Sequence, residues 1–520
     1  MNGVDRRKIA GDSFVFSLVN AFAVVSTTTL NLSIAIKFGV DYQADAFFLA
    51  YALPGVLVGA MATAMRVVLV PTLVHLEERH RSTTAYRLIS TICVVGLALW
   101  LVVALFGVIG GPFYIKLLAP SLPAAAQQIA AQISQWIFIV VPLTWLAEFL
   151  RAQLNAQQRF ILPLVGESLA NIVAVGLVLG LGKHSGIMIV GLGFITRGLI
   201  QIIVSASGLG LTLLDMRPTT VSSHRHEIWS VLRGVAIRLT GSLLRQSSIT
   251  IERFWSAPLG IGAVSALSYA QMGTNVQSNI FSTGVATVLL PKLSRTVSAR
   301  KQREEHRGTM TDVLRLALFL TAPVAAFNII FSYPLCQIIL ASSNTSPELV
   351  ILTSRLLAIY ALRIPTFAWL SVLLTPFYAL EDIWTPVKHM LLMLGINLVL
   401  DMLLVQAMNV YGFPIAAVLT DILSIARAFW LQGRLDVRCS FPRLRRELTI
   451  ILTSTGIATV FALVVRYYGI YIAQTKGLGQ LVNIGIAAIS GTIVYFAASY
   501  LAGIPEARLV TAMLRLRIKL

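Results

Sequence analysis

Apolar stretches long enough to cross a lipid bilayer recur along this whole chain of 520 residues, and they constrain its fold more than any other feature. A helix that crosses the hydrocarbon layer needs roughly 20 apolar residues. Breaks at Gly, Pro and charged clusters divide the sequence into about fourteen such segments. They lie near 12–37, 43–71, 87–110, 126–150, 160–182, 186–212, 229–256, 261–291, 310–334, 349–379, 386–408, 411–433, 448–470 and 478–503. Because 57% of the residues are hydrophobic and only 12% are charged, we expect an all-α polytopic membrane protein.

The basic residues between these segments alternate strongly from one connection to the next. One side of the membrane receives roughly 27 Lys and Arg residues, and the other side receives about 5. Lys and Arg gather in short cytoplasmic loops, so the bias predicts an even number of spans with both termini in the cytoplasm. Basic loops that face anionic membrane lipids also explain most of the net charge of +19, so no nucleic-acid partner is expected.

The cysteines and histidines form no recognisable set of metal ligands. The 3 cysteines lie far apart without a CxxC pair, and the 7 histidines form no HxxxH or HExxH motif. We therefore expect neither a metal centre nor a cofactor.

Two distant segments of the chain resemble each other without gaps. Residues 45–73 and 265–293 are identical at eight of twenty-nine positions, and each runs into a basic loop. Two apolar helices can also match by composition alone. If the repeat is real, it predicts two six-helix lobes related by an axis along the membrane normal, which is a transporter architecture. The predicted divisions are an N-terminal lobe at 1–215, a C-terminal lobe at 216–435, two additional helices at 436–504 and a cytoplasmic amphipathic tail at 505–520.

The predicted span at 229–256 carries charges that lipid could not surround. Arg238, Arg245 and Glu252 follow one another at intervals of seven residues, which places them on one face of a helix. An unpaired charge near the bilayer centre costs about 3 kcal/mol on insertion scales, so such residues pair inside the bundle or border a cavity. We expect Arg238 and Arg245 to line a cavity and bind substrate. Glu252 and Arg253 form either a structural ion pair or part of a gate.

Three arginines in other predicted spans would make the same chamber more basic: Arg66, Arg197 and Arg363. The fixed charge and planar fork of arginine suit a phosphate or diphosphate. The predicted substrate is therefore an anion, and a carrier of organic cations is disfavoured.

Some charged residues have simpler local interpretations. Asp45 either caps its helix, satisfies backbone groups at the outer end of that helix, or takes part in gating. Glu148 and Arg151 lie one helical turn apart, and Asp421 and Arg427 are also expected to interact locally.

Several separated short motifs occur along the chain. They are DAFFLA (45–50), LP (53–54), VP (70–71), LN (154–155), RF (159–160) with Pro163, SAL (265–267), YA (269–270), LLP (289–291), FY (377–378) with Asp382, and TPVK (385–388). In these motifs and in their order the chain resembles the MurJ/MviN family of the MOP exporter and flippase superfamily. The resemblance extends from about residue 12 to 435.

The resemblance implies a fourteen-helix fold with two lobes, a central cavity, and a groove at the two final helices that can hold a polyprenyl tail. It implies a flippase of the bacterial inner membrane, without covalent chemistry, that moves lipid II from the inner to the outer leaflet by alternating access. The expected partners are this undecaprenyl-diphosphate-linked glycan, membrane lipids and enzymes of cell-envelope glycan synthesis. We expect a monomer.

The sequence departs from the family at four positions where an arginine is typical. They hold Val24, Leu30, Val58 and Met272, whereas Asp45 persists and Glu252-Arg253 resembles an acid-Arg pair of some members. Either the diphosphate contacts have moved to Arg238 and Arg245 with lipid II retained, or the cargo is a different lipid-linked glycan. Such a glycan could be the repeat unit of an exopolysaccharide or an O-antigen. A multidrug antiporter of the same superfamily remains a further alternative.

Overall fold

The computed structural model describes residues 3–79, 82–210, 225–278, 303–341, 345–380, 384–434, 441–473 and 478–508, together with residues 281, 343 and 382. Within these ranges the regular elements are helices, and no strand occurs among them. The chain divides into two compact units. The first unit comprises Met1–Ser265, and the second comprises Ala266–Ala341 with Thr345–Leu520.

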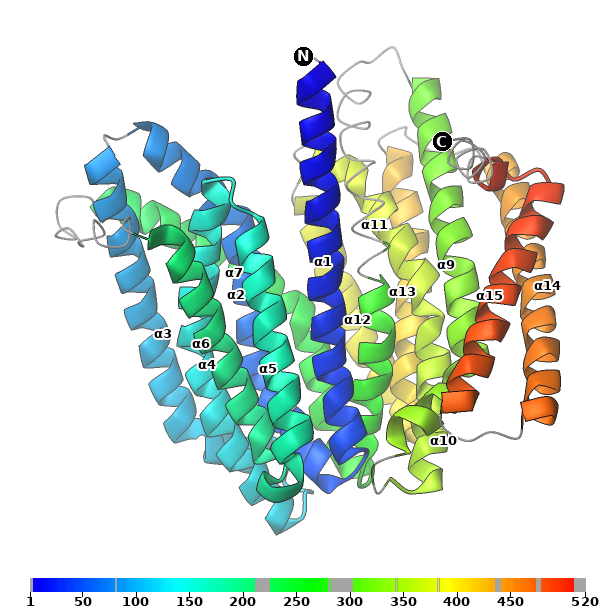
Figure 1. Cartoon of the computed structure of the whole chain (residues 1–520), viewed down its shortest axis with the longest axis horizontal. Coiled ribbons are helices and arrows are strands. Elements are labelled where there is room, and N and C mark those ends of the chain that lie inside the picture. Colours follow the sequence, from blue (N-terminus) through cyan, green and yellow to red (C-terminus); the bar gives the residue numbers. More distant parts are fainter. Residues whose placement is uncertain are drawn as a thin grey trace. The chain divides into compact units, whose positions relative to one another are not determined.

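The first unit is built around one central helix, α4. Its neighbours α2, α3 and α6 pack along α4, while α1 packs on α5 and α7 packs along α2 (Figure 1). The bounds are α1 (Gly3–Phe38), α2 (Tyr42–Arg79), α3 (Ser82–Leu118), α4 (Ala124–Ala156), α5 (Ile161–Ser185), α6 (Met188–Leu209) and α7 (Arg225–Ser256), followed by the 3₁₀ turn η3 (Ala257–Leu259).

A helical segment whose described part is 263–278 begins in the first unit and continues into the second at Ala266. Helix α9 is the central helix of the second unit. Helices α10, α11 and α14 pack on α9, α15 packs on α14, and α12 packs on α13 (Figure 1). The bounds are α9 (Arg303–Leu340), α10 (Pro347–Ala361), α11 (Arg363–Ala379), α12 (Trp384–Met408), η4 (Asn409–Tyr411), α13 (Gly412–Arg434), α14 (Phe441–Ala473) and α15 (Leu478–Leu501).

The described helices confirm an all-α polytopic fold, and 11 of the candidate spans are long and apolar enough to cross a membrane. The predicted number of fourteen is higher for identifiable reasons. Helix α7 is too polar to qualify, the span at 261–291 is only partly described, and Trp384–Gly433 counts once although it contains α12 and α13. The number fourteen stays a prediction.

The predicted span at 349–379 is divided in the structure. Helix α10 ends at Ala361 and α11 begins at Arg363, two residues before Pro365. Proline has no N–H to donate to the preceding turn and restricts the residue before it, so it favours this break.

The division into compact units does not follow the predicted lobe boundary at 215. Because α7 packs along α2, it lies in the first unit, although it would open the second repeat. The lobes as repeats, the additional helices and the tail therefore stay a prediction. The part of the tail beyond residue 508 lies outside the described residues.

Close contact between α3 and α4 depends on glycine. The indole nitrogen of Trp145 donates a hydrogen bond to the carbonyl oxygen of Cys93 at 3.1 Å. A Cβ atom at Gly96 would lie 1.9 Å from the Trp145 ring. The small residue is what lets the buried indole lie against α3.

We expect Gly96→Ala to lower the thermal unfolding midpoint of the purified protein by several degrees, because overpacking of this kind costs about 1–3 kcal/mol. Gly110→Ala on the same helix is the matched control, since a Cβ there meets nothing within 4 Å. Both changes raise helix propensity equally. Equal midpoints for the two variants would contradict the prediction.

Candidate functional site

The polar side of α7 lies against α2 in the first unit. The hydroxyl of Thr250 donates to the carbonyl oxygen of Ala52 at 3.3 Å. A Cβ atom at Gly59 would lie 2.4 Å from the side-chain oxygen of Gln246, so the glycine admits this amide. Part of the polar character predicted for α7 is therefore used in contact with α2.

Glu252 and Arg253, the predicted ion pair or gate, are both buried in this region. The carboxylate of Glu252 accepts a hydrogen bond from the Ser248 hydroxyl at 3.1 Å. The guanidinium of Arg253 lies 5.4 Å from the centre of the Phe48 ring on α2, which is within range for a cation–π interaction. Both residues thus sit where α7 meets α2.

Asp45, in the first turn of α2, holds the start of the helical segment at 263–278. One oxygen accepts from the Gly262 N–H at 2.6 Å, and the other accepts from the Ser265 N–H and hydroxyl, each at 2.7 Å. The first N–H groups of a helix have no partner within the helix, so a buried carboxylate that accepts from them is well compensated. Asp45 therefore caps the start of a helix 217 positions away rather than its own.

The main predicted substrate contacts cannot be placed at the level of side chains. Arg238 and Arg245 lie in α7, and Arg66 lies in α2. Their side chains are outside the described residues, so their role in a cavity stays a prediction.

Arg197 and Arg363, the other predicted cavity arginines, both have acidic partners on neighbouring helices. Arg197 Nη2 lies 3.6 Å from a Glu167 oxygen. Arg363 Nε donates to Asp421 at 2.9 Å, and its Nη2 donates to the other oxygen at 3.3 Å. These partners offset the positive charge that the two arginines would bring to a chamber.

Two interactions that we expected within one helix also involve residues of other helices. Arg151 contacts both Glu148 in its own helix and Glu167 on α5, so the predicted local pair is part of a network over α4, α5 and α6. Asp421, which we expected to interact with Arg427, accepts from Arg363, 58 positions away.

The motif at 377–388 has a local structural function. The Asp382 carboxylate accepts a hydrogen bond from the Thr385 N–H at 3.0 Å, at the beginning of α12. Hydrogen bonds from Thr385 hold the pKa of this half-buried carboxyl below its usual value.

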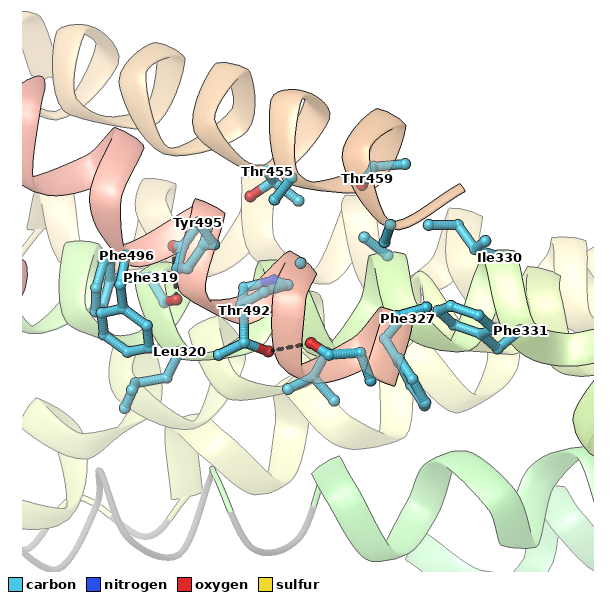
Figure 2. Close-up of a pocket in the computed structure, with 18 of the residues that line it drawn as sticks. Phe319, Leu320, Phe327, Ile330, Phe331, Thr455, Thr459, Thr492, Tyr495 and Phe496 are labelled. Atoms are coloured by element: carbon cyan, nitrogen blue, oxygen red, sulfur yellow. Dashed lines mark hydrogen bonds between the residues drawn. The ribbon is translucent and has the colours of Figure 1, made fainter. Parts of the chain in front are cut away.

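An apolar groove runs between α9, α14 and α15 in the second unit. It encloses about 450 Å³. Phe319, Phe327 and Phe331 of α9 form one wall, and the opposite walls are mainly Ala and Thr side chains of α14 and α15 (Figure 2). We call this space the apolar groove. Its lining also includes Leu320, Ile330, Thr455, Thr459, Ala462, Ala488, Thr492, Tyr495 and Phe496.

A buried arginine joins the same three elements at one end of the groove. Arg315 Nε donates to Glu506 at 2.7 Å, and its Nη1 donates to Glu447 at 3.0 Å. Glu447 belongs to α14, and Glu506 lies in the helical turn at 505–508 after α15. The sequence analysis missed this cluster, although an arginine in the apolar segment at 310–334 was a visible signal.

With this geometry in view, comparison with known proteins identifies the family. A model described as "Lipid II flippase MurJ" matches residues 34–487. The chain belongs to this MurJ family. Members are multi-pass transporters of the bacterial inner membrane rather than catalysts.

Curated MurJ relatives match over most of their length. The probable lipid II flippase MurJ of Rhizobium meliloti (strain 1021) is 24% identical over 533 aligned residues, which cover 97% of this chain and 96% of the relative. The lipid II flippase MurJ of Burkholderia cenocepacia is 24% identical over 382 residues, covering 72% and 73%.

Solved structures show that the fold is shared more widely. A lipid II flippase MurJ in an inward closed conformation has a TM-score of 0.76 at 18% identity, covering 94% of this chain and 98% of that one. An inward-facing MATE multidrug transporter of the MOP superfamily has a TM-score of 0.60 at 14% identity, covering 81% and 95%. At these identities the likeness shows the fold alone.

Of the four positions that depart from the MurJ pattern, one is buried and another packs against an apolar cluster. Leu30 of α1 is buried, and Val58 of α2 packs against a hydrophobic cluster that includes Met61 and Trp145. An arginine at either position would need a compensating partner.

We expect Asp45→Asn to destabilise the protein by about 1–3 kcal/mol, because an amide NH₂ group would face a backbone N–H and leave it unpaired. Asp41→Asn is the control: Asp41 accepts from the Ala44 N–H at 2.8 Å in its own turn, where asparagine caps equally well. The measurement is the thermal midpoint together with transport in vesicles. Parent-like behaviour of Asp45→Asn would show that this anchor is dispensable.

Proposed function

We propose that this chain moves a polyprenyl-diphosphate-linked saccharide of the lipid II type from the inner to the outer leaflet by alternating access. The apolar groove between α9, α14 and α15 carries the proposal. It provides a MurJ-family chain with a lipid-accessible place for a long hydrocarbon tail while the polar headgroup is handled elsewhere.

The walls of the groove suit a flexible apolar chain. Thr455 and Thr492 are two of the polar side chains that line it, and each hydroxyl donates to a carbonyl of its own helix, at 2.8 and 2.7 Å. Tyr495 likewise donates to the Phe319 carbonyl at 2.8 Å (Figure 2). Because these hydroxyls are satisfied within the protein, the remaining surface presented to a ligand is mainly aliphatic and aromatic.

Arg238 and Arg245 are the proposed contacts to the diphosphate, with Arg66 as a further cation. Arg197 and Arg363 contribute less in this scheme, because Glu167 and Asp421 already offset their charges. Two arginines that meet a diphosphate would bring the loaded cavity nearer to neutrality, and this would lower the cost of moving it through a low-dielectric layer.

Asp45 and the Glu252-Arg253 pair are the proposed gate. Asp45 ties α2 to the start of the following helical segment through backbone amides, and Arg253 rests on Phe48 in the same part of α2. Breaking these contacts would release the beginning of the 263–278 helix from α2. Such a release would be one step of alternating access.

A different lipid-linked glycan, such as an exopolysaccharide repeat unit, is the second candidate cargo. The observation that favours it is the loss of the family's arginines at Val24, Leu30, Val58 and Met272. Both cargoes share the polyprenyl diphosphate, so the groove serves either.

Replacement of an essential lipid II flippase by this protein tests the cargo. We expect rescued growth with the parent and at least tenfold fewer colonies with Arg238→Ala or Arg245→Ala, at equal amounts in the membrane. Rescue by both variants would remove these arginines from the mechanism. Failure of the correctly inserted parent, together with restored capsule or slime in its own host, would assign the second cargo.

Filling the groove tests its role. We expect Ala488→Phe, on the groove wall, to reduce transport of the lipid-linked cargo by about tenfold, because the added ring occupies the tail's space. Ala497→Phe is the matched control on an exposed part of α15 outside the lining. Transport would be followed in vesicles as the arrival of the labelled cargo in the outer leaflet. Equal transport by both variants would separate the groove from function.

A further inference from the structure

The apolar groove has an arginine near each end, and the two differ in whether carboxylates neutralise them. At one end Arg315 is fully engaged, since its guanidinium donates to the carboxylates of both Glu506 and Glu447. At the other end lies Arg466 of α14, whose Nη1 donates to the carbonyl oxygen of Ile330 at 3.2 Å. Within the described part of the chain, no carboxylate pairs with Arg466.

Arg466 adjoins the groove through two residues that line it. Besides the bond to Ile330, its guanidinium carbon lies 5.8 Å from the centre of the Phe331 ring. The side chain is only partly buried. A guanidinium has five N–H donors. After one bond to a carbonyl, Arg466 therefore keeps its charge and several N–H groups for a ligand at this end of the apolar groove.

The surroundings of Arg466 are typical of a membrane interface. Tyr467 and Tyr468 follow it and are 72% and 60% exposed, as expected for residues of an aromatic belt. Along α14, nineteen residues separate Glu447 from Arg466, which corresponds to about 28 Å of helix. This is close to the hydrocarbon thickness of about 30 Å, so the two residues mark opposite headgroup levels.

We propose that Arg466 binds the phosphate of a polyprenyl phosphate or diphosphate lipid whose tail occupies the apolar groove. The proposal rests on the proposed function, because it places the same cargo class in the groove and adds its orientation. The Arg315 end offers no free guanidinium to a phosphate, whereas the Arg466 end does. On the predicted topology the Arg466 end faces outwards, so the site holds the carrier lipid after translocation.

The length of the groove favours a long isoprenoid over an ordinary phospholipid. From Phe319 to Phe331 it follows α9 for twelve residues, or about 18 Å. Half of the hydrocarbon layer is about 15 Å thick. A tail anchored at Arg466 can therefore continue past the midplane, which an acyl chain of one leaflet does not need to do.

Native mass spectrometry of the full-length protein in nanodiscs tests the site with three probes: a polyprenyl diphosphate, the corresponding polyprenol and phosphatidylglycerol. We expect Arg466→Gln to weaken binding of the diphosphate about 5- to 10-fold and to leave the polyprenol unchanged, because only the charge-assisted contact is lost. Arg466→Lys should bind the diphosphate more tightly than Arg466→Gln but less tightly than the parent, because lysine keeps the charge and loses the planar fork. Arg355→Gln, at an exposed arginine of α10, is the matched control and should change nothing.

Each other outcome overturns the proposal. Unchanged binding of the diphosphate by Arg466→Gln would show that its phosphate lies elsewhere. An equal loss of diphosphate and polyprenol would reduce Arg466 to a structural role. Equal competition by phosphatidylglycerol would make the site one for bulk lipid.

Ala488→Phe separates this proposal from the proposed function. Suppose that Ala488→Phe abolishes binding of both polyprenyl probes while Arg466→Gln binds them like the parent. That result would support the groove as the tail site and contradict Arg466 as the phosphate site. If Ala488→Phe binds both probes normally, the groove itself is not the tail site.

Discussion

A charge placed among membrane helices must be compensated by the protein, and this requirement ties the helices of each unit together. In the first unit, Arg151 joins α4 to α5 through Glu167, and Asp45 joins α2 to the start of the helical segment at 263–278. In the second unit, Arg315 joins α9 to α14 and to the turn after α15. Apolar side chains fill the space between these clamps, and small residues such as Gly96 let neighbouring helices approach closely.

The same principle separates structural arginines from those available to a ligand. Arg315 and Arg363 are each paired with carboxylates of other helices or turns, so replacing either would leave an acid without its partner. Arg466 contacts a carbonyl and an aromatic ring, and neither of these neutralises it. The state of each arginine, and not the count of basic residues, therefore shows where a phosphate can bind.

The fold was largely predictable from sequence because lipid imposes the length and composition of a span. Within the described ranges the apolar segments form helices, and the segment at 349–379 forms two, because hydropathy did not resolve the break before Pro365. The site was less predictable. The partner of Arg363 lies 58 positions away and that of Arg315 lies 191 positions away, so spacing along one helix gave no access to either pair. The groove was expected only from family resemblance, because its walls are ordinary Ala, Thr and Phe residues of three separate helices.

The Arg315 cluster also has a consequence for biosynthesis. Its two partners on other elements are made late, since Glu447 follows 132 residues and Glu506 follows 191 residues after the arginine. At about 5–20 residues per second, a ribosome reaches the second glutamate roughly 10–40 seconds after Arg315. During that interval the carboxylate within reach of Arg315 is that of Asp312, one turn earlier in α9, which lies 3.1 Å from Nη1. The last helical turn of the described chain therefore supplies a counterion to a helix that was made long before it.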